Sequence, residues 1–341
     1  MNIAIIGCGA IANMRHAPAV DADPGAVLYA VCDPFRPNAD ALAEKYHTRA
    51  VYELDEILAD PAVDAVIICT PERFHCANVV AALQAGKHVL CEKPLAMNPA
   101  EGQKILDAWQ ASGKMLMVSF CQRLYELHKQ AKALLDCGAI GKPIAFRTAL
   151  AHRGVEYATI AAPTPDFYDK KLSGIGDVML SVGCHRVDLV TYLLGSKITA
   201  VSALTPTIDK KYADGTPIHA ADHAMINVEL ENGLVGTLWI SWCCYGGMER
   251  ATVIYGTTGR MTVGEEQGIR IQKLDGTEAF YAVADDPTEG QRITHHFIAA
   301  LQGEEPPVCD GYDGMSCLVA MEAVKRSNRE QRRVTISEII G

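Results

Sequence analysis

The chain has 341 residues, of which 49% are hydrophobic and 21% are charged, and its formal net charge at pH 7 is −10. This composition is typical of a soluble globular protein, and the length allows two domains with sizeable cores. The negative charge and the lack of a run of Lys and Arg argue against nucleic acid and anionic membranes as main partners. No segment approaches the roughly 20 apolar residues that span a bilayer.

The cysteines indicate a reducing compartment. Twelve cysteines are scattered along the chain without a Cys-x-x-Cys pair, which predicts free thiols and no metal site. The opening apolar stretch, residues 3–6, is too short for a signal sequence and is expected to form a strand. We therefore predict a cytoplasmic protein.

The first dozen residues place a glycine-rich turn directly after a short apolar strand. Gly7 permits a tight turn, Gly9 lets the backbone approach a pyrophosphate, and Ala12 keeps the following helix close to the strand. The free N–H groups at the start of that helix then face the anion. A plain strand-to-helix turn is the alternative. The dinucleotide interpretation places cofactor contacts at Gly7, Gly9, Ala10 and Ile11.

A second apolar run, residues 26–32, ends at Asp33, about 20 residues beyond the glycine turn. A carboxylate at this point accepts hydrogen bonds from the adenosine ribose and repels a 2'-phosphate, so NAD is predicted rather than NADP. Arg36 weakens this preference, because its guanidinium is able to fold over a phosphate. The alternative is a solvated Asp that opens the Asp33-Pro34 turn.

Up to residue 122, short apolar strands alternate with helices, which predicts a doubly wound parallel sheet. Beyond it, longer strands joined by tight turns predict a mainly antiparallel sheet. We therefore predict an α/β fold with an N-terminal Rossmann domain at 1–122 and a C-terminal α+β domain, containing a large, mainly antiparallel sheet, at 123–341. The first set of strands is expected at 2–6, 27–32, 65–69, 88–91 and 115–119, and the second at 144–151, 224–230, 234–242, 251–255 and 269–274.

Two segments carry the strongest chemical signal. The first is a strand that ends at a Glu-Lys-Pro loop, and because ligands gather at the carboxyl ends of strands in an open α/β sheet, Lys93 is expected to point into the cofactor crevice. Glu92 belongs to the same cofactor-side loop, and its carboxylate fits an ion pair better than acid catalysis. In the second segment, read as a helix, Ser181, His185 and Asp188 fall on one face.

Five motifs follow one another in a characteristic order: Gly7-x-Gly9-x-x-Ala12, Thr70-Pro71-x-x-x-His75, Glu92-Lys93-Pro94, Gly183-x-His185-x-x-Asp188 and the late pattern Phe297…Pro306-Pro307-Val308. With them the chain resembles the Gfo/Idh/MocA oxidoreductase family over nearly its whole length. The resemblance implies a Rossmann domain and a C-terminal domain whose sheet often mediates oligomerisation. It also implies a tightly held nicotinamide cofactor and a sugar, polyol or related hydroxyl substrate.

The resemblance also implies the catalytic roles. Lys93 would hydrogen-bond the reacting hydroxyl beside the nicotinamide, and His185 would exchange the hydroxyl proton. These residue types suit the task, because a neutral imidazole accepts a proton at cytoplasmic pH and an ammonium stabilises a developing alkoxide. Without the family, a single His on a helix is more often a structural hydrogen-bonding residue.

One departure from the family pattern bears on the catalytic histidine. Dehydrogenases of this family usually carry an Asp four residues before the histidine, where this chain has Ser181. A serine orients the imidazole but cannot offset its positive charge, so His185 is expected to be a weaker base. Asp188 follows the pattern, with a helix-surface salt bridge as the alternative. Asp177 is a second candidate to replace the missing carboxylate, but in a helix its register is wrong for direct contact with His185.

The remaining candidate contacts are less specific. Thr70-Pro71 resembles the adenosine-side loop of the family, and His75 either approaches the cofactor or only packs. Arg123 lies where the family usually shows an Asn-x-Arg-Phe loop, with Cys121 in place of the Asn, and is expected to support the substrate loop and bind substrate. His152 and Tyr157 precede the histidine helix, and their rings and polar tips suit sugar recognition, with solvated loop residues as the alternative.

We therefore predict an NAD-dependent oxidoreductase that transfers hydride between nicotinamide and a hydroxyl-bearing carbon of a sugar, cyclitol or related polyol. Two alternatives stay open: an NAD-dependent glycoside hydrolase that oxidises its sugar transiently and eliminates a glycosidic bond, and a non-catalytic NAD-binding regulatory protein. The strand at 234–240 carries apolar residues on both of its faces, so one face is expected to pack against another subunit. We therefore predict a homodimer or homotetramer.

Overall fold

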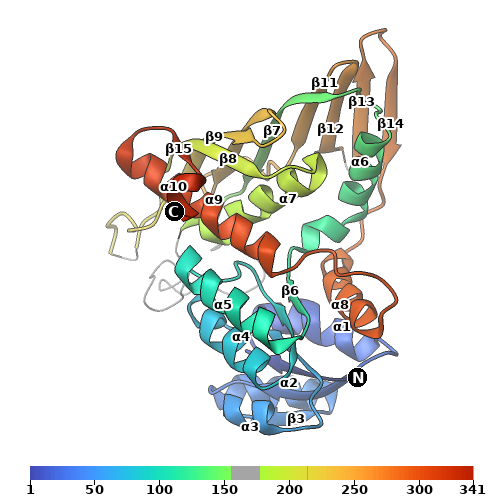
Figure 1. The fold of residues 1–341 in the computed structure, drawn as a ribbon, viewed down its shortest axis with the longest axis vertical. Coiled ribbons are helices and arrows are strands. Elements are labelled where there is room, and N and C mark those ends of the chain that lie inside the picture. The colour runs from blue at the N-terminus through green and yellow to red at the C-terminus, as the bar shows by residue number, and fades with distance from the viewer. Residues whose placement is uncertain (155–176, 213, 267, 341) are drawn as a thin grey trace. The chain divides into compact units, whose positions relative to one another are not determined.

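The computed structural model describes residues 1–154, 177–212, 214–266 and 268–340. The chain forms two compact units (Figure 1). The first unit comprises Met1–Cys121 and Thr288–Leu318, and the second comprises Gln122–Pro287 and Val319–Gly341. The sequence predicts one domain boundary, between residues 122 and 123; in the structure the chain also returns to the first unit at residues 288–318.

The first unit is built on a sheet of six parallel strands in the order β3-β2-β1-β4-β5-β6. Its central strands are continuous apolar runs because both of their faces are covered; every residue of β4 is buried. The strand order reverses between β1 and β4, which is where open α/β sheets bind ligands. The strands are β1 Asn2–Ile6, β2 Val27–Cys32, β3 Arg49–Val51, β4 Ala65–Ile68, β5 His88–Cys91 and β6 Leu116–Val118.

The connections between these strands are mostly helices. The helix after the glycine turn begins with a π-helical turn, η1, and continues as α1. Helix α5 begins where the Asn98 side chain accepts a hydrogen bond from the Glu101 backbone N–H at 3.0 Å, and it ends at Gly113, whose φ is 63°. The helices are η1 Ala12–His16, α1 Ala17–Ala22, α2 Arg36–Tyr46, α3 Leu54–Ala59, η2 Glu72–Phe74, α4 His75–Gln84 and α5 Pro99–Ser112.

The returning segment completes the first unit. It contains η7 Glu289–Gln291, α8 Arg292–Gln302 and the start of α9 Gly311–Glu330. Helix α8 packs against α1. His295 Nδ1 lies 2.7 Å from the Asp23 carboxylate, and His16 Nδ1 lies 2.8 Å from Thr294 Oγ1. Residues far apart in sequence therefore share one core.

The second unit is built on a nine-stranded sheet in the order β14-β13-β12-β11-β7-β10-β9-β8-β15. All neighbours pair antiparallel except β7 and β10, which pair parallel. The two sheets confirm the predicted α/β fold. The strands are β7 Pro143–Ala151, β8 Ile198–Leu204, β9 His223–Leu230, β10 Val235–Ser241, β11 Thr252–Gly256, β12 Gly259–Glu265, β13 Gly268–Lys273, β14 Glu278–Ala282 and β15 Val334–Thr335.

Helices cover one face of this sheet (Figure 1). Helix α6 packs on β12 and β13, and α7 packs on β7. Strand β9 shows the consequence, since Ala224, Ile226, Val228 and Leu230 are buried while the alternate side chains are half-buried or exposed. The helical segments are η3 Cys121–Leu124, α6 Glu126–Asp136, η6 Met179–Gly183, α7 Cys184–Leu194, the second part of α9 and α10 Ser337–Ile340.

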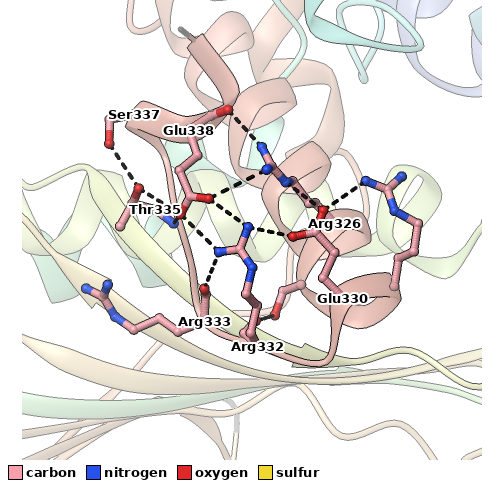
Figure 2. A network of polar contacts seen from close by, with 9 residues as sticks. Arg326, Glu330, Arg332, Arg333, Thr335, Ser337 and Glu338 are labelled. Atoms are coloured by element: carbon pink, nitrogen blue, oxygen red, sulfur yellow. Dashed lines mark hydrogen bonds and ion pairs between the residues drawn. The ribbon is translucent and has the colours of Figure 1, made fainter.

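The C-terminal segment closes one edge of the sheet, where β15 pairs with β8. Figure 2 shows the ion-pair network around it, in which Arg332 Nη2 lies 2.8 Å from Glu338 Oε2 and Arg326 Nε lies 2.9 Å from Glu330 Oε1. Exposed pairs of this kind contribute little individually, because solvent screens them. Together these pairs join the end of α9 to Arg332 and α10, and the edge strand of the sheet, β15, has only two residues.

In the part of the chain that the structure describes, no helix has both the length and the apolar character needed to cross a membrane. All twelve cysteines are free thiols.

Candidate active site

The glycine turn has room for a ligand on one side only. Gly7 has φ +91°, and a Cβ built there would lie 2.7 Å from the backbone of Cys69 and Thr70, so the turn tolerates no side chain at this point. A Cβ built on Gly9 would meet no atom within 4 Å. Gly9 therefore leaves open the approach that a dinucleotide pyrophosphate needs, and the residues present fit the predicted cofactor.

Asp33 directly follows β2, and each of its carboxylate oxygens accepts a backbone hydrogen bond. Its Oδ2 accepts a hydrogen bond from the Cys8 backbone N–H at 2.9 Å, and its Oδ1 accepts one from the Phe35 N–H at 2.9 Å. The half-buried carboxylate thus connects the glycine turn to the end of β2. The Arg36 guanidinium lies 4.3 Å from the centre of the Tyr52 ring, in a cation–π contact on the same unit.

The loop that follows β5 rests on a buried carboxylate. Glu92 is 5% exposed. Its Oε1 accepts hydrogen bonds from Arg15 Nη1 and Ser119 Oγ, both at 2.8 Å, and lies 3.1 Å from His16 Nε2. Its Oε2 accepts a bond from the Lys93 backbone N–H at 3.1 Å. Glu92 is therefore a positioning residue for the loop that carries Lys93.

The environment of Glu92 keeps it ionised. Burial raises its pKa, but the positive charge of Arg15 and the hydrogen bond with His16 outweigh this effect and hold the pKa well below its usual range. Burial also lowers the pKa of His16. Sequence reasoning did not single out Arg15 or His16; their signal was two polar residues on the helix that begins at the glycine turn.

His75 connects the loops that follow β4 and β5. The ring is 1% exposed, its Nδ1 lies 2.7 Å from the Pro94 carbonyl oxygen, and its Nε2 lies 2.9 Å from the Thr70 carbonyl oxygen. Both nitrogens are used within the unit, which favours the packing role over direct contact with a cofactor. Thr70 is fixed further, because its Oγ1 accepts a hydrogen bond from Asn78 Nδ2 at 3.2 Å.

In the second unit, Arg123 and Asp188 form a buried ion pair. Arg123 Nε donates to both carboxylate oxygens, at 3.0 and 3.1 Å, and Nη2 donates to Oδ1 at 2.6 Å. The two residues are 6% and 3% exposed. Asp188 is thus a buried partner rather than a helix-surface residue. The charge of Arg123 is balanced within the unit, so the structure favours a supporting role over direct substrate binding for this guanidinium.

His185 lies in the first turn of α7, directly after the π-helical turn η6. The sequence predicts an ordinary α-helix over this segment. The structure instead has a π-helical turn, and Gly183 accommodates it at a point where a Cβ would lie 2.6 Å from Met179 Sδ. Ser181 and His185 are both half-buried. The Oδ1 of Asp177 accepts hydrogen bonds from the Met179 and Leu180 N–H groups, both at 2.9 Å, so this oxygen serves the start of the helix.

His152 follows β7 and is held by its backbone. Its N–H donates to the Ser241 carbonyl oxygen at 2.9 Å, and its carbonyl oxygen accepts from the Cys244 N–H at 3.1 Å. Its ring Nδ1 accepts a bond from the Gly154 N–H at 3.1 Å. Tyr157, the other predicted substrate contact of this region, lies outside the described residues.

The predicted site residues are divided between the units. The glycine turn, Asp33, Thr70-Pro71, His75, Glu92 and Lys93 belong to the first unit, and Arg123, His152, Ser181 and His185 belong to the second. Among the residues described, no group of three or more His, Cys, Asp or Glu side chains could hold a metal ion.

A parallel sheet with a glycine-rich phosphate turn at its switch point, an acidic residue after the second strand and a lysine loop after β5 defines the class of dinucleotide-dependent oxidoreductases. The chain belongs to the Gfo/Idh/MocA family. Residues 1–120 match the family model described as an oxidoreductase family with an NAD-binding Rossmann fold, and residues 128–262 match the GFO/IDH/MocA C-terminal domain. The resemblance drawn from the motifs and the predicted NAD cofactor are thereby confirmed.

Similar proteins cover the whole chain. Myo-inositol 2-dehydrogenase of Thermotoga maritima is 27% identical over 100% of both chains. Inositol 2-dehydrogenase/D-chiro-inositol 3-dehydrogenase of Shouchella clausii is 30% identical over 97% of this chain and 93% of its own length. The structure of a levoglucosan dehydrogenase in complex with NADH and levoglucosan has a TM-score of 0.88 at 23% identity, over 98% of this chain and 99% of that one, and shows the same fold.

Proposed function

We propose that this chain is an NAD-dependent oxidoreductase that transfers hydride between nicotinamide and a hydroxyl-bearing carbon of a sugar, cyclitol or related polyol. The observation that carries the proposal is the buried Glu92 network, which fixes the Lys93 loop at the carboxyl end of β5 in an NAD-binding module. The relatives named as inositol dehydrogenases support a cyclitol or a related polyol as substrate class.

In this proposal Lys93 and His185 divide the chemistry at the hydroxyl. The Lys93 ammonium donates a hydrogen bond to the reacting oxygen and stabilises the negative charge that develops there. The His185 imidazole accepts the hydroxyl proton during oxidation and returns it during reduction. Glu92 holds the Lys93 loop in position, and the pair of Arg123 and Asp188 holds the helix that carries His185.

Ser181 and His152 complete the proposed substrate side. Ser181 orients the His185 ring without adding a negative charge. His152, with its backbone fixed at the end of β7, offers a ring nitrogen and an apolar face to a sugar or cyclitol. We propose Tyr157 as a further contact on the basis of the sequence alone.

The test is a turnover assay with NAD and myo-inositol, D-chiro-inositol or levoglucosan, followed by the near-ultraviolet absorbance of reduced nicotinamide. We expect lasting reduction of NAD with at least one of the three probes. Lys93→Ala and His185→Ala should each lower turnover about 100-fold or more while NAD binding is retained. Glycoside cleavage without net reduction would favour the hydrolase instead, and NAD binding without either reaction would favour a regulatory protein.

We further propose that the protein is a cytoplasmic homodimer or homotetramer. Leu204, Met225 and Trp239 lie opposite one another on β8, β9 and β10, on the face of the sheet away from α6 and α7. Leu204 and Met225 are 51% and 57% exposed. This apolar row, together with Val235, which is 51% exposed, supports burial against the same face of a second copy.

A further inference from the structure

A fully buried carboxylate organises one end of the second unit. Asp222 is 0% exposed and immediately precedes β9. Its carboxylate oxygens accept hydrogen bonds from three successive backbone N–H groups, those of Ile208, Asp209 and Lys210, each at 2.8 Å. Burial and the neighbouring Asp222 carboxylate raise the pKa of the Cys243 thiol to about 12. A carboxylate with this many donors holds the segment from 208 to 210 firmly against the sheet.

Lys210 extends this arrangement to the loop after β7. The side chain is 4% exposed, and its Nζ donates a hydrogen bond to the Arg153 carbonyl oxygen at 2.7 Å. The same ammonium lies 4.9 Å from the centre of the Tyr245 ring, and the Tyr245 hydroxyl donates to the Asp209 carboxylate. A buried ammonium is costly unless its donors are used, and the Lys210 ammonium uses one of them to fix the backbone at Arg153.

The residues next to Asp222 also hold the start of the histidine helix. The Ala221 carbonyl oxygen accepts a hydrogen bond from the Val178 N–H at 2.9 Å, directly before η6. The Asp222 carbonyl oxygen accepts one from the Trp242 N–H at 2.8 Å, at the end of β10. Residues 221 and 222 therefore bond to the sheet and to the segment that leads to His185, while Lys210, whose N–H bonds to the Asp222 carboxylate, bonds to the loop at 152–153.

We infer that Asp222 and Lys210 are positioning residues that hold the loop at His152 and the start of the His185 helix in one fixed arrangement and thereby set the affinity for the hydroxyl substrate. The inference rests on the proposed function, which places His152 and His185 at the substrate. Neither Asp222 nor Lys210 has to touch the substrate. Their effect comes through geometry, because a displacement of about 1 Å in a binding group costs up to about 100-fold in catalytic efficiency.

The test compares Lys210→Met with Lys211→Met, which removes the adjacent, exposed lysine. We expect Lys210→Met to raise KM for the best probe among myo-inositol, D-chiro-inositol and levoglucosan about tenfold, with kcat within about twofold of the wild type. The dissociation constant for NAD should not change, because the NAD-binding module is a separate unit. Lys210→Arg, which keeps a donor, should restore part of the affinity. An unchanged KM in Lys210→Met would overturn the inference.

Hydrogen exchange gives a readout that needs no substrate. In the NAD-bound full chain, Lys210→Met should speed amide exchange at residues 152–154, and Asp222→Asn should speed it there and at 178–180, while Lys211→Met leaves both segments unchanged. Wild-type exchange rates at both segments in Asp222→Asn would refute the positioning role even if none of the probes is oxidised. If the wild-type protein oxidises none of the probes but the variants show the expected exchange, the positioning role stands and the proposed substrate class is rejected.

Discussion

Ser181 and His185 lie on either side of the junction between η6 and α7, and both side chains are half-buried. A hydroxyl does not stabilise an imidazolium as a carboxylate does. We predict that Ser181→Asp retains NAD binding and moves the acidic limb of the pH–rate profile to higher pH, because the added charge stabilises the protonated ring. Steady-state rates across pH check this. Ser181→Asn introduces a side chain of the same size as Asp but without the charge, so it should leave the acidic limb in place. Equal shifts of the acidic limb in both variants would exclude an electrostatic cause.

The ionised Glu92 side chain contributes to the stability of the folded protein. Its pKa is lowered in the folded state, so its ionised form stabilises the protein above about pH 4.3, where an unfolded glutamate titrates, and this contribution is lost as pH falls through the folded pKa. We predict that Glu92→Gln lowers the free energy of unfolding by about 3 kcal/mol at pH 7. The difference from the wild type should shrink below about pH 4.

Thermal melting followed by circular dichroism at several pH values measures the effect of Glu92→Gln. Glu44→Gln is the matched control, because Glu44 is exposed on α2 and its replacement should leave the melting temperature nearly unchanged. If Glu92→Gln melts like the wild type at pH 7, the buried network does not support the Lys93 loop energetically.

At the scale of elements, the two glycines of the turn after β1 are expected to respond differently to substitution. We predict that Gly9→Ala melts like the wild type but binds NAD at least about tenfold more weakly, because a methyl group there occupies the approach of a pyrophosphate. Gly7→Ala should destabilise the protein, since the backbone has a positive φ and its Cβ would meet backbone atoms. Calorimetric titration with NAD together with thermal melting separates the two effects. Wild-type affinity in Gly9→Ala would place the pyrophosphate elsewhere.

Burial explains in part which elements can be predicted from the sequence. A strand covered on both faces is a continuous apolar run, so the expectation of residues 65–69 lies within one residue of β4, Ala65–Ile68. β14 is exposed at every residue and β3 has only three residues, so neither shows the apolar alternation that identifies a strand. η6 was expected to be α-helical, because a π-helical turn leaves almost the same apolar pattern in the sequence.

The residues of the candidate site also differ in whether the sequence indicates them. The sequence predicts roles for Lys93 and His185 because each belongs to a short local motif, and these roles stay predictions. Lys210 and Asp222 belong to none, and the bond from Lys210 to the Arg153 carbonyl joins residues 57 positions apart. Contacts of this range arise only when the sheet has assembled, and one sequence without the fold contains no spacing that indicates them.

At the scale of the whole molecule, the chain passes between its units at residues 121–122, 287–288 and 318–319. The first unit therefore needs residues 288–318, whose helix α8 packs on α1 and supplies Thr294 to the buried His16 ring. We predict that a fragment of residues 1–122 is less stable and binds NAD more weakly than the same fragment joined by a flexible linker to residues 288–318. Chemical denaturation and NAD titration of both fragments check this, and equal stability would make the returning segment dispensable.

The proposed oligomer depends on the apolar row of Leu204, Met225 and Trp239 on the outer face of the large sheet. If two copies bury this face against each other, Met225→Glu places a carboxylate at the centre of the contact, where it must be desolvated without a partner. We predict that the substitution raises the dissociation constant of the oligomer about 100-fold or more, because an uncompensated buried charge costs at least about 3 kcal/mol.

Light scattering at micromolar concentration measures the mass of the oligomer. Leu274→Glu is the matched control, since Leu274 is 82% exposed at the end of β13 and lies outside the row, and this variant should keep the wild-type mass. A monomeric mass for the wild type would rule out the assembly, whereas a Met225→Glu variant that stays oligomeric would move the interface to another surface.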